Sequence, residues 1–214
     1  MKKWFGILGA LTALAGCQDS TSDVAVVAHE ELAAAPDTVI VSDGLTVEMY
    51  LPDNPLAIEL DARLQANAGV QMGLDLMADE GFTRDGTAYY LRGVGVDGRA
   101  LEATWFPVTD ATGERVSLLG HVRTDTNEFV IPVRSLDPGE PAANVGLLAR
   151  GKNGQWRPST SSFESCLSFY QALFVACYGA CIESGIKSDA CYRSCRVTVM
   201  VAFVACIFFA TADS

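Results

Sequence analysis

The chain has 214 residues, of which 50% are apolar and 19% are charged, so it can bury a core and is not disordered throughout. It carries 15 Lys and Arg against 26 Asp and Glu, a formal net charge of −11. Because nucleic-acid binding requires a basic face, this charge excludes a nucleic-acid partner. The sequence has no phosphate-cradling glycine loop and no metalloprotease motif, so we expect neither a cofactor nor a bound metal.

The first residues have the form of a secretory signal peptide. Lys2 and Lys3 precede an apolar run that is too short to span a bilayer. The run ends in Leu14-Ala15-Gly16-Cys17, which resembles the lipobox of bacterial lipoproteins. The resemblance implies that residues 1–16 are removed and that Cys17 becomes the acylated N-terminus.

The resemblance also implies a location in the cell. Acyl chains on Cys17 anchor such a protein in a bacterial envelope membrane, because two or more chains bind lipid stably. Gln18 stands where Asp favours retention in the inner membrane, so we expect the outer membrane. Residues 17–36 are polar and acidic without a sustained period, which predicts a flexible tether. The alternative is an ordinary signal peptide that is cleaved near Ala15.

Residues 37–157 have the pattern of an antiparallel β-domain. Apolar residues recur at every second position, which places them on one face of half-buried strands. The clearest examples are Ile58, Leu60, Ala62 and Leu64, then Val70, Met72, Leu74 and Leu76, and finally Phe129, Ile131 and Val133.

Turn residues agree with this pattern. The strongest unit is a hairpin of Tyr89–Val96 and Arg99–Phe106 around Asp97-Gly98, a dipeptide that favours tight turns. Eight or nine short strands without a long helical period predict an acidic, sandwich-like domain.

Candidate catalytic and ligand residues are few in this domain. His121 with Asp110 or Asp125 is a conceivable catalytic dyad, but no nucleophile elbow accompanies it, so we predict no catalytic residues. Neither oxygen-rich cluster follows the order of a calcium loop, so we predict no metal there. The clusters are Asp125, Asn127 and Glu128, and Asp75, Asp79, Glu80 and Asp85. Trp105, Tyr89 and Tyr90 form either a sugar-stacking face or, as we expect, core and cross-strand pairs.

Residues 158–214 contain six of the 7 cysteines, with the palindromic spacing 11, 4, 10, 4 and 11 around Ile186. Two antiparallel helices that meet at Ile186 bring residues equidistant from the turn together. We therefore predict a stapled helical hairpin, with helices over about 162–184 and 189–211. The predicted disulfides are Cys166–Cys206, Cys177–Cys195 and Cys181–Cys191.

The inner four cysteines, Cys177-x3-Cys181 and Cys191-x3-Cys195, resemble the twin CX3C hairpin of small mitochondrial intermembrane-space chaperones. The likeness covers about 20 residues of this sequence, and we transfer no function from it. The alternative is a four-cysteine zinc site, which leaves Cys166 and Cys206 without a role.

The predicted hairpin is unusually apolar, since Val197–Ala212 contains no charged residue. Sixteen helical residues span roughly 24 Å, which is short of the ~30 Å bilayer core. The apolar surface therefore docks on the β-domain, on a second copy in a homo-oligomer or on a partner protein, or it enters lipid.

Together these features predict an α+β protein, in which an all-β domain precedes a disulfide-stapled hairpin. We interpret it as a non-enzymatic, lipid-anchored protein of the cell envelope that serves as a binding or structural module. The alternatives are a membrane-active or pore-forming hairpin and an envelope hydrolase that uses His121.

Overall fold

The computed structural model describes residues 34–42, 44–113, 116–133, 147–159 and 189–210, together with the single positions 166, 169, 176, 177, 180 and 181. The predicted signal peptide, Cys17 and most of the predicted tether lie outside the described residues. So does most of the first predicted hairpin helix, although Cys166, Cys177 and Cys181 have helical backbone.

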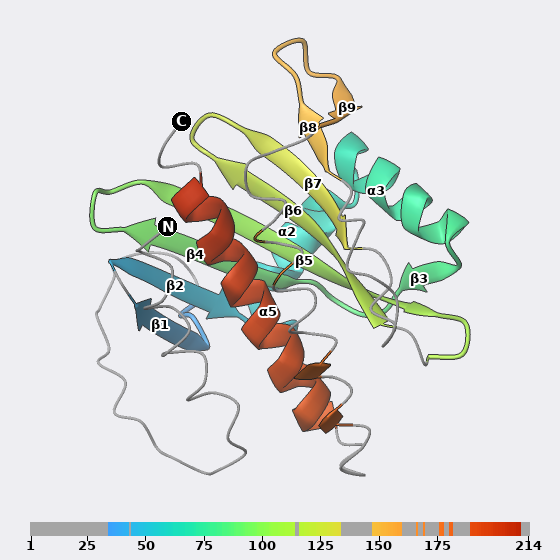
Figure 1. Ribbon diagram of the computed structural model, residues 1–214, viewed down its shortest axis with the longest axis horizontal. Helices are drawn as coiled ribbons and strands as arrows, with labels where there is room; N and C mark the ends of the chain where they lie inside the picture. The colour runs from blue at the N-terminus through green and yellow to red at the C-terminus, as the bar shows by residue number, and fades with distance from the viewer. Residues whose placement is uncertain are drawn as a thin grey trace.

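A nine-stranded antiparallel sheet forms the centre of the molecule (Figure 1). Its main path runs in the order β1-β2-β4-β5-β6-β7-β8-β9, and β3 pairs with the far end of β5. The strands are β1 Thr38–Ser42, β2 Leu45–Tyr50, β3 Phe82–Arg84, β4 Tyr89–Gly95, β5 Ala100–Asp110, β6 Val116–Thr124, β7 Glu128–Val133, β8 Leu148–Arg150 and β9 Trp156–Pro158.

The predicted hairpin around Asp97-Gly98 is confirmed as β4 and β5. Gly98 has a φ of 80° and its N–H donates to the Gly95 carbonyl, which closes the turn. An L-residue with a side chain rarely adopts this backbone conformation, so the glycine is needed there. Tyr89 lies opposite Trp105 in the resulting ladder.

Helices replace the strands predicted from the alternation over residues 58–64 and 70–76, and that part of the prediction is wrong. Helix α2 is Pro55–Leu64 and helix α3 is Ala68–Asp79. The buried positions of α2 are Ala57, Leu60, Asp61 and Leu64, which follow a helical and not a two-residue spacing.

Two asparagines start these helices. The side chain of Asn54 accepts from the Leu56 N–H, and Asn67 accepts from Gly69 and Val70. Asn54 is followed by Pro55 at the first helical position, which is a standard helix start. Ile58, which the alternating pattern places with the core, is instead 49% exposed.

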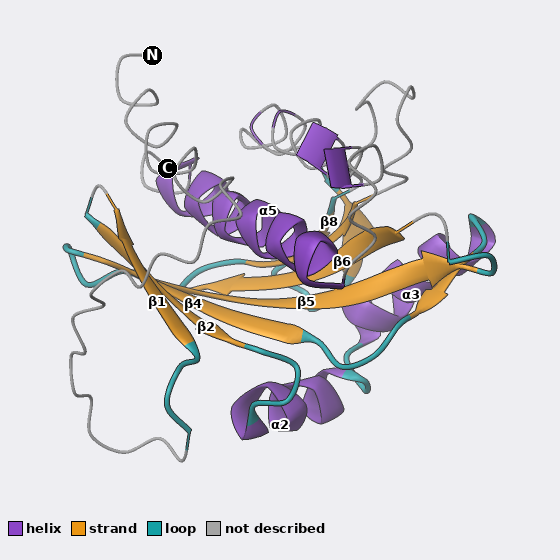
Figure 2. Cartoon of the chain, turned by 90° about the horizontal axis from the view of Figure 1, so that it is seen from below, coloured by secondary structure: helices purple, strands orange, loops and turns teal. Residues whose placement is uncertain are grey.

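Helix α5, Asp189–Ala210, agrees with the second predicted hairpin helix and packs on the sheet. It covers one face of the sheet, while α2 and α3 lie on the other (Figure 2). The fold is therefore mixed α+β, and residues 37–157 contain one sheet in the described region instead of two packed sheets.

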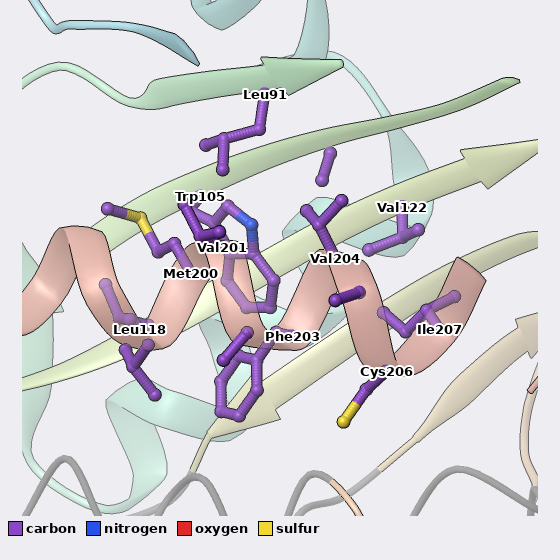
Figure 3. Close-up of a cluster of buried hydrophobic side chains, with 14 of the residues drawn as sticks. Leu91, Trp105, Leu118, Val122, Met200, Val201, Phe203, Val204, Cys206 and Ile207 are labelled. Atoms are coloured by element: carbon purple, nitrogen blue, oxygen red, sulfur yellow. The ribbon is translucent and has the colours of Figure 1, made fainter. Parts of the chain in front are cut away.

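The contact between α5 and the sheet forms the largest hydrophobic core (Figure 3). Trp105 and Phe203 meet with ring centroids 5.2 Å apart, and both side chains are fully buried. The side chains from Val199 to Phe208 are all buried. Within the described residues, no helix combines the length and the apolar character needed to cross a bilayer.

Three disulfides join α5 to the segment before it. They are Cys166–Cys206, Cys177–Cys195 and Cys181–Cys191, with Cα–Cα distances of 6.0, 5.9 and 6.1 Å. These are the three pairs that the palindromic spacing predicts. Four sulfurs joined in two disulfides offer no thiolates to zinc, so the zinc alternative is incompatible with this pairing.

Truncation of Phe203 tests whether α5 belongs to the core. We expect Phe203→Ala to lower the free energy of unfolding by about 3–5 kcal/mol, because it removes a fully buried ring. Urea denaturation measures this difference. The control is Phe169→Ala, since Phe169 is 52% exposed and its loss costs less than about 1 kcal/mol. Equal losses in the two variants would contradict the core role of α5.

Candidate functional site

A polar pocket lies on the face of the sheet that carries α2 and α3. Its volume is about 560 Å³, within the ~300–1,000 Å³ of typical small-molecule sites. Leu60 and Leu64 of α2 form its apolar part. The polar lining comes from α2, the loop before α3 and strands β4 to β8, and comprises Arg63, Asn67, Tyr90, Glu102, Thr104, His121, Arg123, Glu128 and Arg150.

Strand register brings these side chains together. Tyr90, Thr104 and His121 are direct neighbours across β4, β5 and β6. Two residues along, Glu102 lies opposite Arg123, and Arg123 lies opposite Glu128. Residues two apart in a strand share a face, so both rows line the same side of the sheet.

The second row is part of a longer ladder of alternating charge. Glu48 lies opposite Arg92, Arg92 opposite Glu102, and the row continues through Arg123 to Glu128. Arg150 of β8 extends it by an ion pair with Glu128 at 2.8 Å. Six neighbouring strands thus present acid and base in turn, an arrangement that stabilises cross-strand pairs. We name this row the charge ladder.

Glu128 holds the pocket together. One carboxylate oxygen accepts from His121 Nε2 at 2.8 Å and from Asn67 Nδ2 at 3.2 Å, and the other accepts from Arg150. Burial acts to raise the pKa of Glu128, but the hydrogen bonds from His121 and Arg150 outweigh it and lower the pKa. Because Asn67 also caps α3, this carboxylate connects the start of that helix to three strands.

His121 is 7% exposed, and this burial lowers its pKa against the opposing effect of Glu128. The imidazole is therefore neutral at neutral pH and donates through Nε2 to the carboxylate. Its partner is Glu128 and not Asp110 or Asp125, so neither of the two conceivable dyads is formed. His121 pairs with Thr104, which is six residues from Asp110 along β5, whereas Glu128 lies on the neighbouring strand.

A hydrolase that works through a side-chain nucleophile would require a hydroxyl or thiol beside this histidine. Among the described residues, no hydroxyl or thiol is hydrogen-bonded to His121, whose side chain bonds to Glu128. Burial and the neighbouring Glu102 carboxylate raise the pKa of Tyr90, which therefore remains protonated.

Two of the pocket arginines have no carboxylate partner. In the part of the chain that the structure describes, neither Arg63 nor Arg123 forms an ion pair, whereas Arg150 is paired with Glu128. Both lie at the solvent-exposed side of the pocket. Two unpaired guanidinium groups can bind carboxylate or phosphate oxygens, for which their planar donor fork is well suited.

The other candidate residues named from the sequence divide between the hydrophobic core and the pocket. Trp105 and Tyr89 are buried in the core with α5, while Tyr90 lines the pocket. Glu128 of the first predicted oxygen cluster belongs to the pocket. Across the described residues, no group of three or more His, Cys, Asp or Glu is arranged to hold a metal.

The arginines of the pocket carry no local signal in the sequence. Arg63 lies inside the alternating pattern from which a strand is predicted, Arg123 is near acidic residues, and Arg150 has no acidic residue close to it in the sequence. The pairing of β6, β7 and β8 brings Arg123 and Arg150 together, and the packing of α2 adds Arg63. Asn67 was accessible to sequence reasoning, because an asparagine before a helical pattern is a common N-cap.

The buried histidine predicts a pH-dependent stability. Its unfolded pKa is near 6.5 and its folded pKa is lower, so its contribution is complete above pH 6.5 and is lost as pH falls through the folded value. We expect the free energy of unfolding to decrease below pH 6.5 by at most about 1.4 kcal/mol per pH unit from this group. Urea denaturation between pH 7.5 and 5 measures the slope.

His121→Gln removes the titrating group and keeps a donor for Glu128, so it should flatten the slope in this range. The matched control is His29→Gln, which alters the only other histidine of the chain. If the His29 substitution flattens the slope and the His121 substitution does not, the assignment to the pocket is wrong.

Known proteins offer no function to transfer to this pocket. The chain matches no protein-family model, no curated protein and no solved structure. Function therefore has to come from the chemistry of the site and from the placement of α5.

Proposed function

We propose that the chain is a non-enzymatic, lipid-anchored binding protein of the bacterial cell envelope, with the polar pocket as its binding site. The observation that carries the proposal is the pocket itself, a cavity of about 560 Å³ formed by one helix, one loop and five strands. Its polar groups stand on a rigid sheet, as specific binding of a small molecule requires.

The anchor in this proposal is Cys17, which the lipobox resemblance marks for acylation. The following residues, to position 36, tether the folded part to the outer membrane. The tether ends close to the fold, since the Ala35 carbonyl accepts from Asn54 Nδ2 at 3.0 Å. This arrangement leaves the pocket free to meet small molecules in the adjoining aqueous space.

The tail completes the protein's own core in this proposal. Support comes from the burial of α5 against the sheet, which removes the apolar surface that a membrane-active hairpin must expose. The three disulfides join α5 to the preceding segment at Cys166, Cys177 and Cys181. Release of α5 into lipid would require exposure of Trp105 and the surrounding core.

A hydrolase is the second candidate, and one observation favours it. His121 and Glu128 have the donor–acceptor distance of a general-base pair, 2.8 Å, and the imidazole is neutral. In such an enzyme His121 would activate a water molecule instead of a side-chain nucleophile. Hydrolysis of an envelope ester or peptide that is lost in His121→Gln would replace the binding function by this one.

Exchange of the signal tests both the anchor and the tail. Residues 1–17 are replaced by an ordinary cleavable signal peptide, and membranes of the producing bacterium are washed with carbonate. We expect the exchanged protein to be soluble and the parent to stay in the membrane fraction, because α5 is already covered within the fold.

Metabolic labelling with a radioactive fatty acid is the matched control, and only the parent should incorporate it. Retention of the exchanged protein in washed membranes would contradict the proposal and favour the membrane-active hairpin. Absence of label in the parent would show that Cys17 is not acylated.

A further inference from the structure

We propose that the pocket binds an anionic small molecule, a carboxylate or a phosphate monoester, through the guanidinium groups of Arg63 and Arg123. This inference rests on the proposed binding function and names the chemical class of the ligand. Its starting point is the distribution of arginine in an otherwise acidic region.

Arginine is scarce where the pocket forms. Residues 18–150 contain 8 Arg, no Lys and 22 Asp and Glu, a net charge of −14. Three of those 8 arginines line this single cavity. A region so rich in acid has positive charge at one place only if arginines gather there. Strand pairing places Arg123 and Arg150 on the two strands that flank β7, and helix α2 adds Arg63.

The described arginines of this region fall into two groups, those that form an ion pair with a carboxylate and those that do not. Six arginines between residues 34 and 150 are described, and four of them form an ion pair with a carboxylate. The two without such a pair, Arg63 and Arg123, both line the pocket. The four that are paired are Arg84, Arg92, Arg99 and Arg150.

The carboxylates of the pocket leave these two arginines available. Glu128 already accepts hydrogen bonds from His121, Asn67 and Arg150, so its charge is matched within the fold. Glu102 faces Tyr90, whose proton it helps to retain. Glu102 and Glu128 flank Arg123 in the charge ladder, but no described carboxylate lies within ion-pair distance of Arg63 or Arg123. An anion supplied by a ligand can therefore accept hydrogen bonds from both guanidinium groups.

The same groups disfavour the other ligand classes. A cation would approach two unpaired guanidinium groups and would compete with three donors for Glu128. A neutral sugar would offer hydroxyl acceptors but no negative charge, so its hydrogen bonds with the two guanidinium groups would be weaker than those of an anion. An anion accepts from them, and the hydroxyl groups of Tyr90 and Thr104, which also line the cavity, can bind the rest of the molecule.

Calorimetric titration of the full mature protein in non-ionic detergent tests the inference. The anionic probes are succinate, a dicarboxylate, and glycerol 3-phosphate, a phosphate monoester. The neutral and cationic probes of similar size are succinamide and 1,4-diaminobutane. We expect one of the two anions to bind, and the one that binds identifies the oxyanion of the natural ligand.

The variants are Arg63→Gln and Arg123→Gln, with Arg99→Gln as the matched control. Both pocket side chains are solvent-exposed, so glutamine leaves the fold intact, which a thermal melt checks. Each pocket substitution should weaken anion binding at least tenfold, because a charged hydrogen bond is lost. Arg99 pairs with Asp97 in the β4–β5 turn, so its substitution should leave the affinity unchanged.

Three results would overturn the inference, and they are distinguishable. Binding of succinamide or 1,4-diaminobutane in place of the anions would show that the pocket is a binding site of another class, and the proposed function would stand. Lack of binding by all four probes would count against both the inference and the proposed function. Anion binding that survives both pocket substitutions would place the anion elsewhere on the protein.

Discussion

The packing of α5 against the sheet is the contact on which the rest of the molecule depends. This antiparallel sheet carries apolar side chains on both of its faces. Other elements must therefore pack on each face to bury those side chains. Helices α2 and α3 cover part of one face, and α5 covers the other through Trp105 and Phe203. Buried apolar side chains hold α5 on the sheet, and three disulfides join it to the segment that precedes it in the chain.

The pocket follows from this division of the two faces. Since α5 supplies the larger apolar cover on its own side, the opposite face can carry polar rows without loss of the core. Glu128 then connects β6, β8 and the start of α3 through hydrogen bonds. The residues that we propose to bind the ligand therefore stand on a frame whose stability is supplied by the other face.

The sequence predicts local features well and long-range ones poorly. The β4–β5 hairpin follows from Asp97-Gly98 between alternating residues, and the range of α5 follows from the cysteine palindrome around position 186. Residues 58–64 were misassigned because Ile58, Leu60, Ala62 and Leu64 alternate, although Leu60 and Leu64 also lie one helical turn apart. The segment is a helix and not a strand because Asn54 and Pro55 form a helix start and only one side of the helix packs on the core.

The pocket was beyond prediction for a different reason. Glu128 and Arg123 are close in sequence, but Arg63 and Arg150 are 87 positions apart and meet only through the tertiary fold. Single residues scattered on separate strands give no periodic signal, since their meeting depends on the register of each pair. His121 was singled out by its type alone, and its true partner depends on the pairing of β6 with β7.

The charge ladder has a consequence for how the strands choose their alignment. Alternation of apolar and polar residues excludes a slip by one residue, because such a slip turns every side chain to the wrong face. A register shift of two residues between neighbouring strands keeps each side chain on its native face of the sheet. The alternation of apolar and polar residues therefore does not exclude such a shift. If β5 slipped in this way against β4, Arg92 would stand opposite Thr104 or Ala100 and would lose Glu102, one of its two cross-strand carboxylate neighbours. The charge ladder thus favours the native strand register over registers that are shifted by two residues.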